Sequence, residues 1–283
     1  MSRVTISGLH KKKQKGEKIT ALTVYDYPFA RLADEAGIDC LLVSDVLGQV
    51  GLGYESTVPV TLEQMVHHTK AVLRGSNRAL VIAKMPFLSG AGGFPSALES
   101  AERLIKEAGA RGLEVEGGRE ILPVVSGLVQ AGIPIMPHIG ATVQTYLRSG
   151  VFVTQGKKAA EAKALLDLSS ELEAAGAFAI MLECVPAEVA QAMSRGLKIP
   201  VIGIGSGPGC DGQLLVAQDL LGLFERFVPR FVKVYRKMGQ EVLVAFKEFR
   251  EEVVGGAFPA AEHSTRMEAD QLESLKRALE SES

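Results

Sequence analysis

The stretch Cys40-Leu41-Leu42-Val43-Ser44-Asp45 consists of four apolar residues that end on a polar pair, after which the chain enters a loop. Other apolar runs end in the same way and are separated by stretches with helical spacing. They are Ile19 to Val24 before Tyr25-Asp26, Leu80 to Ala83 before Lys84, Leu113-Glu114-Val115 before Glu116, Ile133 to Met136 before His138, Phe178 to Leu182 before Glu183, and Val201 to Ile204 before a glycine-rich stretch. Short β-branched runs that alternate with helices predict βα units and a parallel sheet. We therefore predict an α/β fold, a (β/α)₈ TIM-type barrel, and an enzyme, because such barrels gather their chemistry at the C-terminal ends of the strands.

The composition fits one barrel domain. The chain has 283 residues, of which 47% are hydrophobic and 23% charged, a size and balance typical of a (β/α)₈ domain. A formal net charge of −2 argues against a nucleic-acid or membrane-surface partner, which needs a strong basic excess. Cys40, Cys184 and Cys210 cannot all pair, and no signal peptide is evident, so we expect a cytoplasmic location. We place the barrel, with a short N-terminal helix, at residues 1–264 and a helical tail at residues 265–283.

Three further patterns locate loops and helices around the expected barrel. The loop from Leu47 to Pro59 has glycines at positions 48, 51 and 53, more than a plain βα turn needs, so we expect it at the active site. Thr61 followed by Gln64 predicts a capping box at the start of a helix. Near the C-terminus, the spacing predicts an amphipathic helix over Leu220 to Glu252 and a separate exposed helix over Glu268 to Glu280.

Three carboxylates stand at the ends of predicted strands: Asp45, Glu116 and Glu183. Carboxylates that converge on a barrel mouth suit a hard divalent cation such as Mg²⁺, which prefers oxygen ligands. The alternative is that each carboxylate caps the helix that follows its strand. A single acidic residue would favour the cap, whereas three at matching positions favour a functional site.

Several motifs in register resemble the ketopantoate hydroxymethyltransferase family, and the likeness runs from about Ile6 to Ser264. The motifs are Ala21-Leu22-Thr23-Val24-Tyr25-Asp26-Tyr27, Val43-Ser44-Asp45-Val46-Leu47-Gly48, Ser56-Thr57-Val58-Pro59-Val60-Thr61, Val115-Glu116-Gly117-Gly118, His138-Ile139-Gly140, Leu182-Glu183-Cys184-Val185-Pro186, Pro200 to Gln213, and Phe258-Pro259-Ala260-Ala261-Glu262-His263-Ser264. The resemblance implies the barrel of the phosphoenolpyruvate mutase/isocitrate lyase superfamily. It also implies transfer of a hydroxymethyl group from 5,10-methylenetetrahydrofolate to 3-methyl-2-oxobutanoate, giving 2-dehydropantoate for pantothenate and coenzyme A biosynthesis.

The resemblance also assigns roles to residues. Removal of a proton from C3 of the 2-oxo acid leaves an enolate, whose charge a chelated divalent cation stabilises. Asp45 and Glu116 would hold Mg²⁺, and Glu183 would be the catalytic acid/base group. The candidate substrate-binding residues are Asp45, Lys84, Glu114 and His138. The family further implies a homo-oligomer, often a large ring of dimers such as a decamer.

The chain departs from the family at four positions. The family has a second aspartate metal ligand where this chain has Lys84, and a substrate-binding lysine where this chain has Glu114. The serine that donates to the keto-acid carboxylate is Val46 here, and a basic residue is replaced by Val153 in the stretch Phe152 to Gly156. Because side chains alternate along a strand, Glu114 and Glu116 face the same side, with Lys84 at the matching height on the neighbouring strand. Acid and base have therefore traded strands while the local formal charge is kept.

This charge swap allows three arrangements. In the first, Glu114 replaces the missing aspartate as a metal ligand and Lys84 binds the substrate carboxylate. In the second, the ammonium of Lys84 lies between Asp45 and Glu116, where the cation would be, and the metal is lost. A lysine beside two carboxylates gains about as much attraction as burial costs it, so this arrangement is feasible. In the third, the chain is a divergent paralogue that acts on another 2-oxo acid by metal- or lysine-assisted enolate chemistry, or a non-catalytic homo-oligomer that binds a keto acid.

Overall fold

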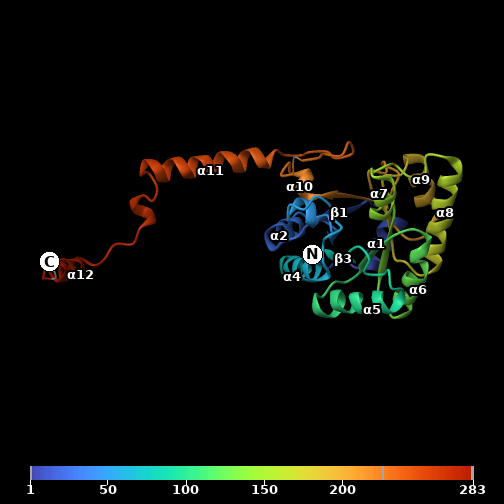
Figure 1. Ribbon diagram of the computed structural model, residues 1–283, viewed down its shortest axis with the longest axis horizontal. Helices are drawn as coiled ribbons and strands as arrows, with labels where there is room; N and C mark the ends of the chain where they lie inside the picture. The colour runs from blue at the N-terminus through green and yellow to red at the C-terminus, as the bar shows by residue number, and fades with distance from the viewer. Residues whose placement is uncertain (1, 225, 282–283) are drawn as a thin grey trace.

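Eight parallel strands form a closed barrel in the order β1 to β8, which confirms the predicted (β/α)₈ fold (Figure 1). The computed structural model describes residues 2–224 and 226–281, so the last two residues of the predicted tail lie outside the described part. The strands are β1 (Ile19–Thr23), β2 (Cys40–Val43), β3 (Leu80–Lys84), β4 (Leu113–Glu116), β5 (Ile135–Gly140), β6 (Ile180–Glu183), β7 (Val201–Ile204) and β8 (Gly212–Val216).

Helices between successive strands cover the outside of the barrel, one helix precedes the first strand, and the remaining helices follow the last strand. They are α1 (Ile6–Gln14), α2 (Tyr27–Glu35), α3 (Leu47–Val50), α4 (Leu62–Gly75), α5 (Phe94–Glu102), the π-helical turn η1 (Arg103–Glu107), the 3₁₀ turn η2 (Arg119–Ile121), α6 (Leu122–Gln130), α7 (Val143–Ser149), α8 (Ala159–Ala174), α9 (Ala187–Gly196), α10 (Ala217–Leu220), α11 (Met238–Gly255), the 3₁₀ turn η3 (Ala261–His263) and α12 (Ala269–Ser281). The capping box at α4 is confirmed, since the Thr61 hydroxyl accepts from the N–H of Gln64 and the Gln64 carboxamide accepts from the N–H of Thr61.

Two apolar clusters separate the inside of the barrel from its outside. Residues such as Val81, Val115 and Leu182 pack outward against the helices. Residues such as Ile82 and Met181 fill the interior. Because the side-chain period of a strand is two, the next inward residues after this apolar layer stand at the C-terminal strand ends. There the inward positions hold polar side chains instead: Lys84, Glu114, Glu116, His138 and Glu183.

The C-terminal region differs from its prediction. The expected continuous helix over 220–252 is wrong: α10 ends at Leu220, and α11 begins only at Met238. Pro229 accounts for part of the break, because proline lacks an N–H and disfavours helical geometry in the residue before it. The separate helix expected over 268–280 is confirmed as α12. Figure 1 shows α11 and α12 extending away from the barrel, and neither has a buried residue.

The helices of the described chain fall short of what crossing a bilayer requires. None of those in residues 2–224 and 226–281 is both long and apolar enough to cross a membrane.

Candidate functional site

The ammonium of Lys84 forms the centre of a polar cluster at the C-terminal mouth of the barrel. Its Nζ lies 2.8 Å from Oδ1 of Asp45 and donates a second, shorter hydrogen bond to Oε2 of Glu116. All three side chains are nearly inaccessible, with exposed fractions of 5%, 1% and 6%. The ammonium of Lys84 therefore lies between Asp45 and Glu116, the position that the second of the three arrangements gives it.

A second set of contacts runs through His138. Its Nδ1 lies 3.0 Å from Oε1 of Glu114, and its Nε2 lies 3.1 Å from Oε2 of Glu183. The Glu183 contact has the distance of an ion pair but not the alignment of a hydrogen bond, since Nε2 has no hydrogen-bond partner in the described structure. Glu183 is 23% exposed, the most accessible of these side chains. A histidine thus links a buried carboxylate to a carboxylate that reaches the barrel mouth.

The strand register explains why these side chains meet. Lys84 pairs in register with Glu114, and Glu116 pairs with His138. The predicted height match between Lys84 and Glu114 is therefore confirmed. Although these two residues are neighbours, the ammonium turns to Asp45 and Glu116, and Glu114 turns to the histidine.

The buried charges control one another's protonation. Burial opposes the charge of Lys84, but attraction to Asp45, Glu116 and Glu114 outweighs it and raises the pKa of Lys84 well above its usual value. Burial raises the pKa of Asp45, although the ammonium opposes this rise, and the Glu116 carboxyl keeps a lowered pKa because Lys84 and His138 outweigh its burial. Burial alone would lower the pKa of His138, but Glu114, Glu183 and Glu116 raise it to about 10. These shifts in pKa keep Lys84 an ammonium and His138 an imidazolium at neutral pH.

Local backbone geometry holds Glu183 in place. Gly140 has φ +104, and a Cβ there would lie 2.2 Å from the carbonyl oxygen of Glu183, so only glycine allows β5 and β6 to approach so closely. Cys184, which follows the catalytic candidate, adopts φ 50, and its N–H donates to the carbonyl of Ile204. A positive φ is uncommon for a residue other than glycine, and residues with such strained backbone geometry cluster at functional sites.

Two parts of the site were not predicted. Helix α7 begins beside Glu116, where the N–H of Val143 donates to Oε1 at 2.5 Å and the carboxamide of Gln144 donates to the Glu116 carbonyl at 3.2 Å. Tyr25, at the end of β1, is buried near Asp45, and burial raises the pKa of its hydroxyl. Tyr25 follows one apolar run, and Thr142, the N-cap residue of α7, follows another, so both positions carried a usable sequence signal.

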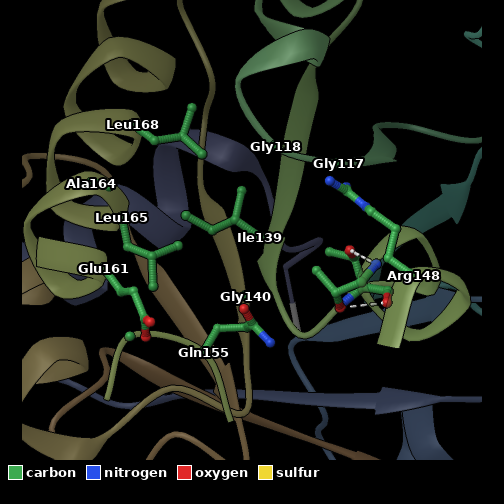
Figure 2. A pocket seen from close by; sticks show the side chains of 13 residues that line it. Gly117, Gly118, Ile139, Gly140, Arg148, Gln155, Glu161, Ala164, Leu165 and Leu168 are labelled. Carbon is green, nitrogen blue, oxygen red and sulfur yellow. Dashed lines mark hydrogen bonds between the residues drawn. The ribbon is translucent and has the colours of Figure 1, made fainter. Parts of the chain in front are cut away.

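Of two cavities in this part of the described structure, one adjoins the cluster. The larger has a volume of about 440 Å³ and is lined by Asp45, Lys84, Glu116 and Gln144 together with the loop 85–93. This volume falls within the roughly 300–1,000 Å³ typical of small-molecule sites. The smaller, of about 250 Å³, lies beyond Gly117 (Figure 2). The predicted site residues that face the larger cavity are Asp45, Lys84 and Glu116; Val46 is not among its lining residues.

A divalent cation between Asp45 and Glu116, which the family resemblance implies, does not fit the residues present. The ammonium of Lys84 occupies the position between the two carboxylates. Within residues 2–224 and 226–281, no group of three or more His, Cys, Asp or Glu side chains is placed to hold a metal ion. Asp45 Oδ2 and Glu114 Oε2 are buried acceptors that lack hydrogen-bond partners in the described structure.

Solved structures of other proteins share this fold. A phosphonopyruvate hydrolase, solved with oxalate and Mg²⁺, matches with a TM-score of 0.60 at 14% identity and covers 98% of each chain. A 2,3-dimethylmalate lyase, a member of the phosphoenolpyruvate mutase/isocitrate lyase superfamily, matches with a TM-score of 0.55 at 16% identity over 97% of this chain and 98% of that chain. These matches show that the chain shares its barrel fold with both proteins.

Sequence comparisons define the family more closely. A family model described as ketopantoate hydroxymethyltransferase matches residues 3–261. A 3-methyl-2-oxobutanoate hydroxymethyltransferase from Moorella thermoacetica is 50% identical over 263 residues, which cover 93% of this chain and 98% of that protein. One from Carboxydothermus hydrogenoformans is 49% identical over 275 residues, or 97% and 100% of the two chains. The chain belongs to the ketopantoate hydroxymethyltransferase family, a family of transferase enzymes.

Proposed function

We propose that this protein transfers a hydroxymethyl group from 5,10-methylenetetrahydrofolate to 3-methyl-2-oxobutanoate, giving 2-dehydropantoate for pantothenate and coenzyme A biosynthesis. The observation that carries the proposal is the convergence of Glu183 and His138 with the Asp45–Lys84–Glu116 cluster at the barrel mouth of a chain from this family. Membership alone does not fix the substrate, because one fold serves many reactions. The residues, however, match what the reaction needs.

The chemistry starts with a proton on C3 of the 2-oxo acid. The Glu183 carboxylate takes this proton, the C3–H bond breaks, and its electron pair moves to the keto oxygen to give an enolate. Water adds to the methylene carbon of the folate, both C–N bonds break, and the two water protons go to N5 and N10, so that tetrahydrofolate leaves and the carbon becomes formaldehyde. C3 of the enolate then attacks the formaldehyde carbon, and the alkoxide that forms takes the proton back from Glu183 to give the hydroxymethyl group. The His138 imidazolium lies 3.1 Å from Oε2 of Glu183 and orients that carboxylate. The substrate-binding roles of Asp45, Lys84, Glu114 and His138 are part of this proposal.

The assay measures formation of tetrahydrofolate and of 2-dehydropantoate from 5,10-methylenetetrahydrofolate and 3-methyl-2-oxobutanoate. Product that depends on enzyme and on both substrates supports the proposal. Binding of the 2-oxo acid without any product would instead identify a non-catalytic keto-acid-binding relative. Such a result would refute the proposed activity.

A second candidate is the same chemistry on a different 2-oxo acid. It is favoured by Val46, which replaces the serine that the family resemblance places on the substrate carboxylate, and by the Lys84/Glu114 swap. A panel of 2-oxo acids that differ at C3 separates the two candidates. A kcat/KM at least about tenfold higher for another acid, which corresponds to roughly 1.4 kcal/mol of transition-state binding, would favour the second.

We also propose that the chain forms a homo-oligomer in the cytoplasm, with residues 1–264 as the barrel domain and the rest as a helical tail. Helix α11 supports association because it leaves Phe246, Phe249 and Val254 exposed at 68%, 57% and 76%. Exposed apolar surface of this extent is typical of interaction sites. Light scattering of the full chain gives its mass, and a monomer at micromolar concentration would refute this part.

A further inference from the structure

One ammonium group holds two carboxylates at the centre of the candidate site. Lys84 reaches them from the end of β3, whereas Asp45 follows β2 and Glu116 ends β4. The three side chains are 6% exposed or less. Removing one member of such a buried pair is strongly unfavourable, because it leaves an uncompensated charge. The ammonium is therefore a fixed part of the site.

We propose that in this chain the Lys84 ammonium takes the place of a divalent cation: it stays between Asp45 and Glu116 and stabilises the enolate oxygen of the 2-oxo acid, so that the reaction proceeds without a metal. This inference rests on the proposed function, because it concerns the enolate that the proposed reaction forms. It also assigns a chemical role to the charge swap between residues 84 and 114.

The donor count of the ammonium leaves room for a substrate oxygen. A lysine ammonium has three N–H donors. In the described structure two of them have acceptors, on Asp45 and Glu116. Lys84 also lines the 440 Å³ cavity. The remaining donor can thus meet a keto oxygen whose negative charge grows as the C3 proton leaves. A fixed positive donor aimed at developing charge is the general device by which enzymes stabilise oxyanions.

The same contacts argue against covalent chemistry at Lys84. An imine requires an uncharged amine whose lone pair attacks the keto carbon. Here the nitrogen is protonated and directs two of its N–H groups to carboxylates. The proposed role is therefore electrostatic: no bond to nitrogen forms, and the proton from C3 goes to Glu183.

Metal titration of the wild-type chain tests the inference without reference to turnover. Mn²⁺ added to the purified protein, with and without 3-methyl-2-oxobutanoate, is followed by electron paramagnetic resonance and calorimetry. We expect no stoichiometric binding by the wild type. Binding of one Mn²⁺ per chain would overturn the inference, and this measurement needs no variant to fold.

A double variant provides the positive comparison. Lys84→Asp with Glu114→Lys keeps the formal charge and removes the ammonium from between the carboxylates. Loss of a side chain that hydrogen-bonds to a metal ligand typically costs 10–100-fold in metal affinity. Replacing the Lys84 ammonium with an aspartate carboxylate, itself a metal ligand, should therefore strengthen Mn²⁺ binding by roughly that factor or more. Lys70→Asp with Glu107→Lys is the matched control, since it makes the same two substitutions, with the same formal charge, in an exposed ion pair. Equal Mn²⁺ affinity in wild type and double variant would contradict the inference.

Activity measurements separate this inference from the proposed function. Wild-type turnover should be unchanged by EDTA, whereas turnover of the double variant should require Mg²⁺. Loss of wild-type turnover in EDTA and its recovery with Mg²⁺ would refute the role of Lys84 and leave the proposed function standing. Absence of turnover under every condition would refute the proposed function, and the Mn²⁺ titration would still decide whether lysine occupies the cation position. Inactivation by borohydride only when the 2-oxo acid is present would reveal an imine and overturn the electrostatic role.

Discussion

The substitution Lys84→Met tests the energetics of the buried cluster directly. Methionine keeps much of the side-chain length but removes the charge that Asp45 and Glu116 share. Breaking a buried ion pair by removing one partner costs about 3–5 kcal/mol. Because the cluster lines a cavity that water can enter, we expect the lower end, about 3 kcal/mol of unfolding free energy.

Urea unfolding at neutral pH measures this loss, provided that the slope with denaturant stays the same in both proteins. Lys70→Met is the matched control, because the Lys70–Glu107 pair is exposed, with side-chain accessibilities of 40% and 44%, and surface pairs contribute at most about 1 kcal/mol. A loss below about 1 kcal/mol for Lys84→Met would refute the reasoning, since the two carboxylates would then not depend on the ammonium.

Two further readouts follow from the same substitution. The loss should be smaller at acidic pH, because an unpaired carboxyl can take up a proton and remove its own buried charge. Mg²⁺ should stabilise the variant but not the wild type, by about 2.7 kcal/mol when its concentration is 100 times the Kd. Equal stabilisation of both proteins by Mg²⁺ would show that the lysine does not hold the cation position.

The sequence was sufficient to predict the barrel and the residues at its mouth. Short apolar runs that end on polar residues are a local signal, and the strand period of two then places Lys84 beside Glu114. The capping box at Thr61 is equally local and is confirmed. These features depend on residues that are close in sequence or on one strand-to-strand register.

The pairing within the cluster could not be predicted in the same way. Three acidic side chains lie within reach of Lys84, namely Asp45, Glu114 and Glu116. The formal charge of the cluster is the same whichever of them the ammonium pairs with. Which carboxylates pair with Lys84 depends on which one binds His138, and the register of β4 and β5 determines that contact. A long-range competition between donors of this kind leaves no pattern in a single sequence.

The remaining predictions concern the acid/base group and two structural positions. Glu183→Gln should lower turnover by roughly 10²–10⁴-fold in steady-state kinetics, with a circular dichroism spectrum like that of the wild type. The exposed control Glu188→Gln should keep wild-type turnover. Equal turnover in Glu183→Gln and the wild type would rule out the acid/base role of Glu183. Gly140→Ala should lower the melting temperature, since its Cβ would lie 2.2 Å from the Glu183 carbonyl oxygen at a φ of +104, and an unchanged melting temperature would contradict that close approach. Asp34→Asn should cost about 1–3 kcal/mol of unfolding free energy at neutral pH, because the carboxylate accepts from the backbone N–H groups at 77–79. Burial raises the pKa of Asp34, but those hydrogen bonds outweigh burial and lower the pKa below its value in the unfolded chain. The stabilisation is therefore complete above the unfolded-state pKa and is lost as the pH falls through the folded-state pKa. Urea unfolding should show that the stability difference between wild type and Asp34→Asn shrinks in acid, and a constant difference would refute this prediction.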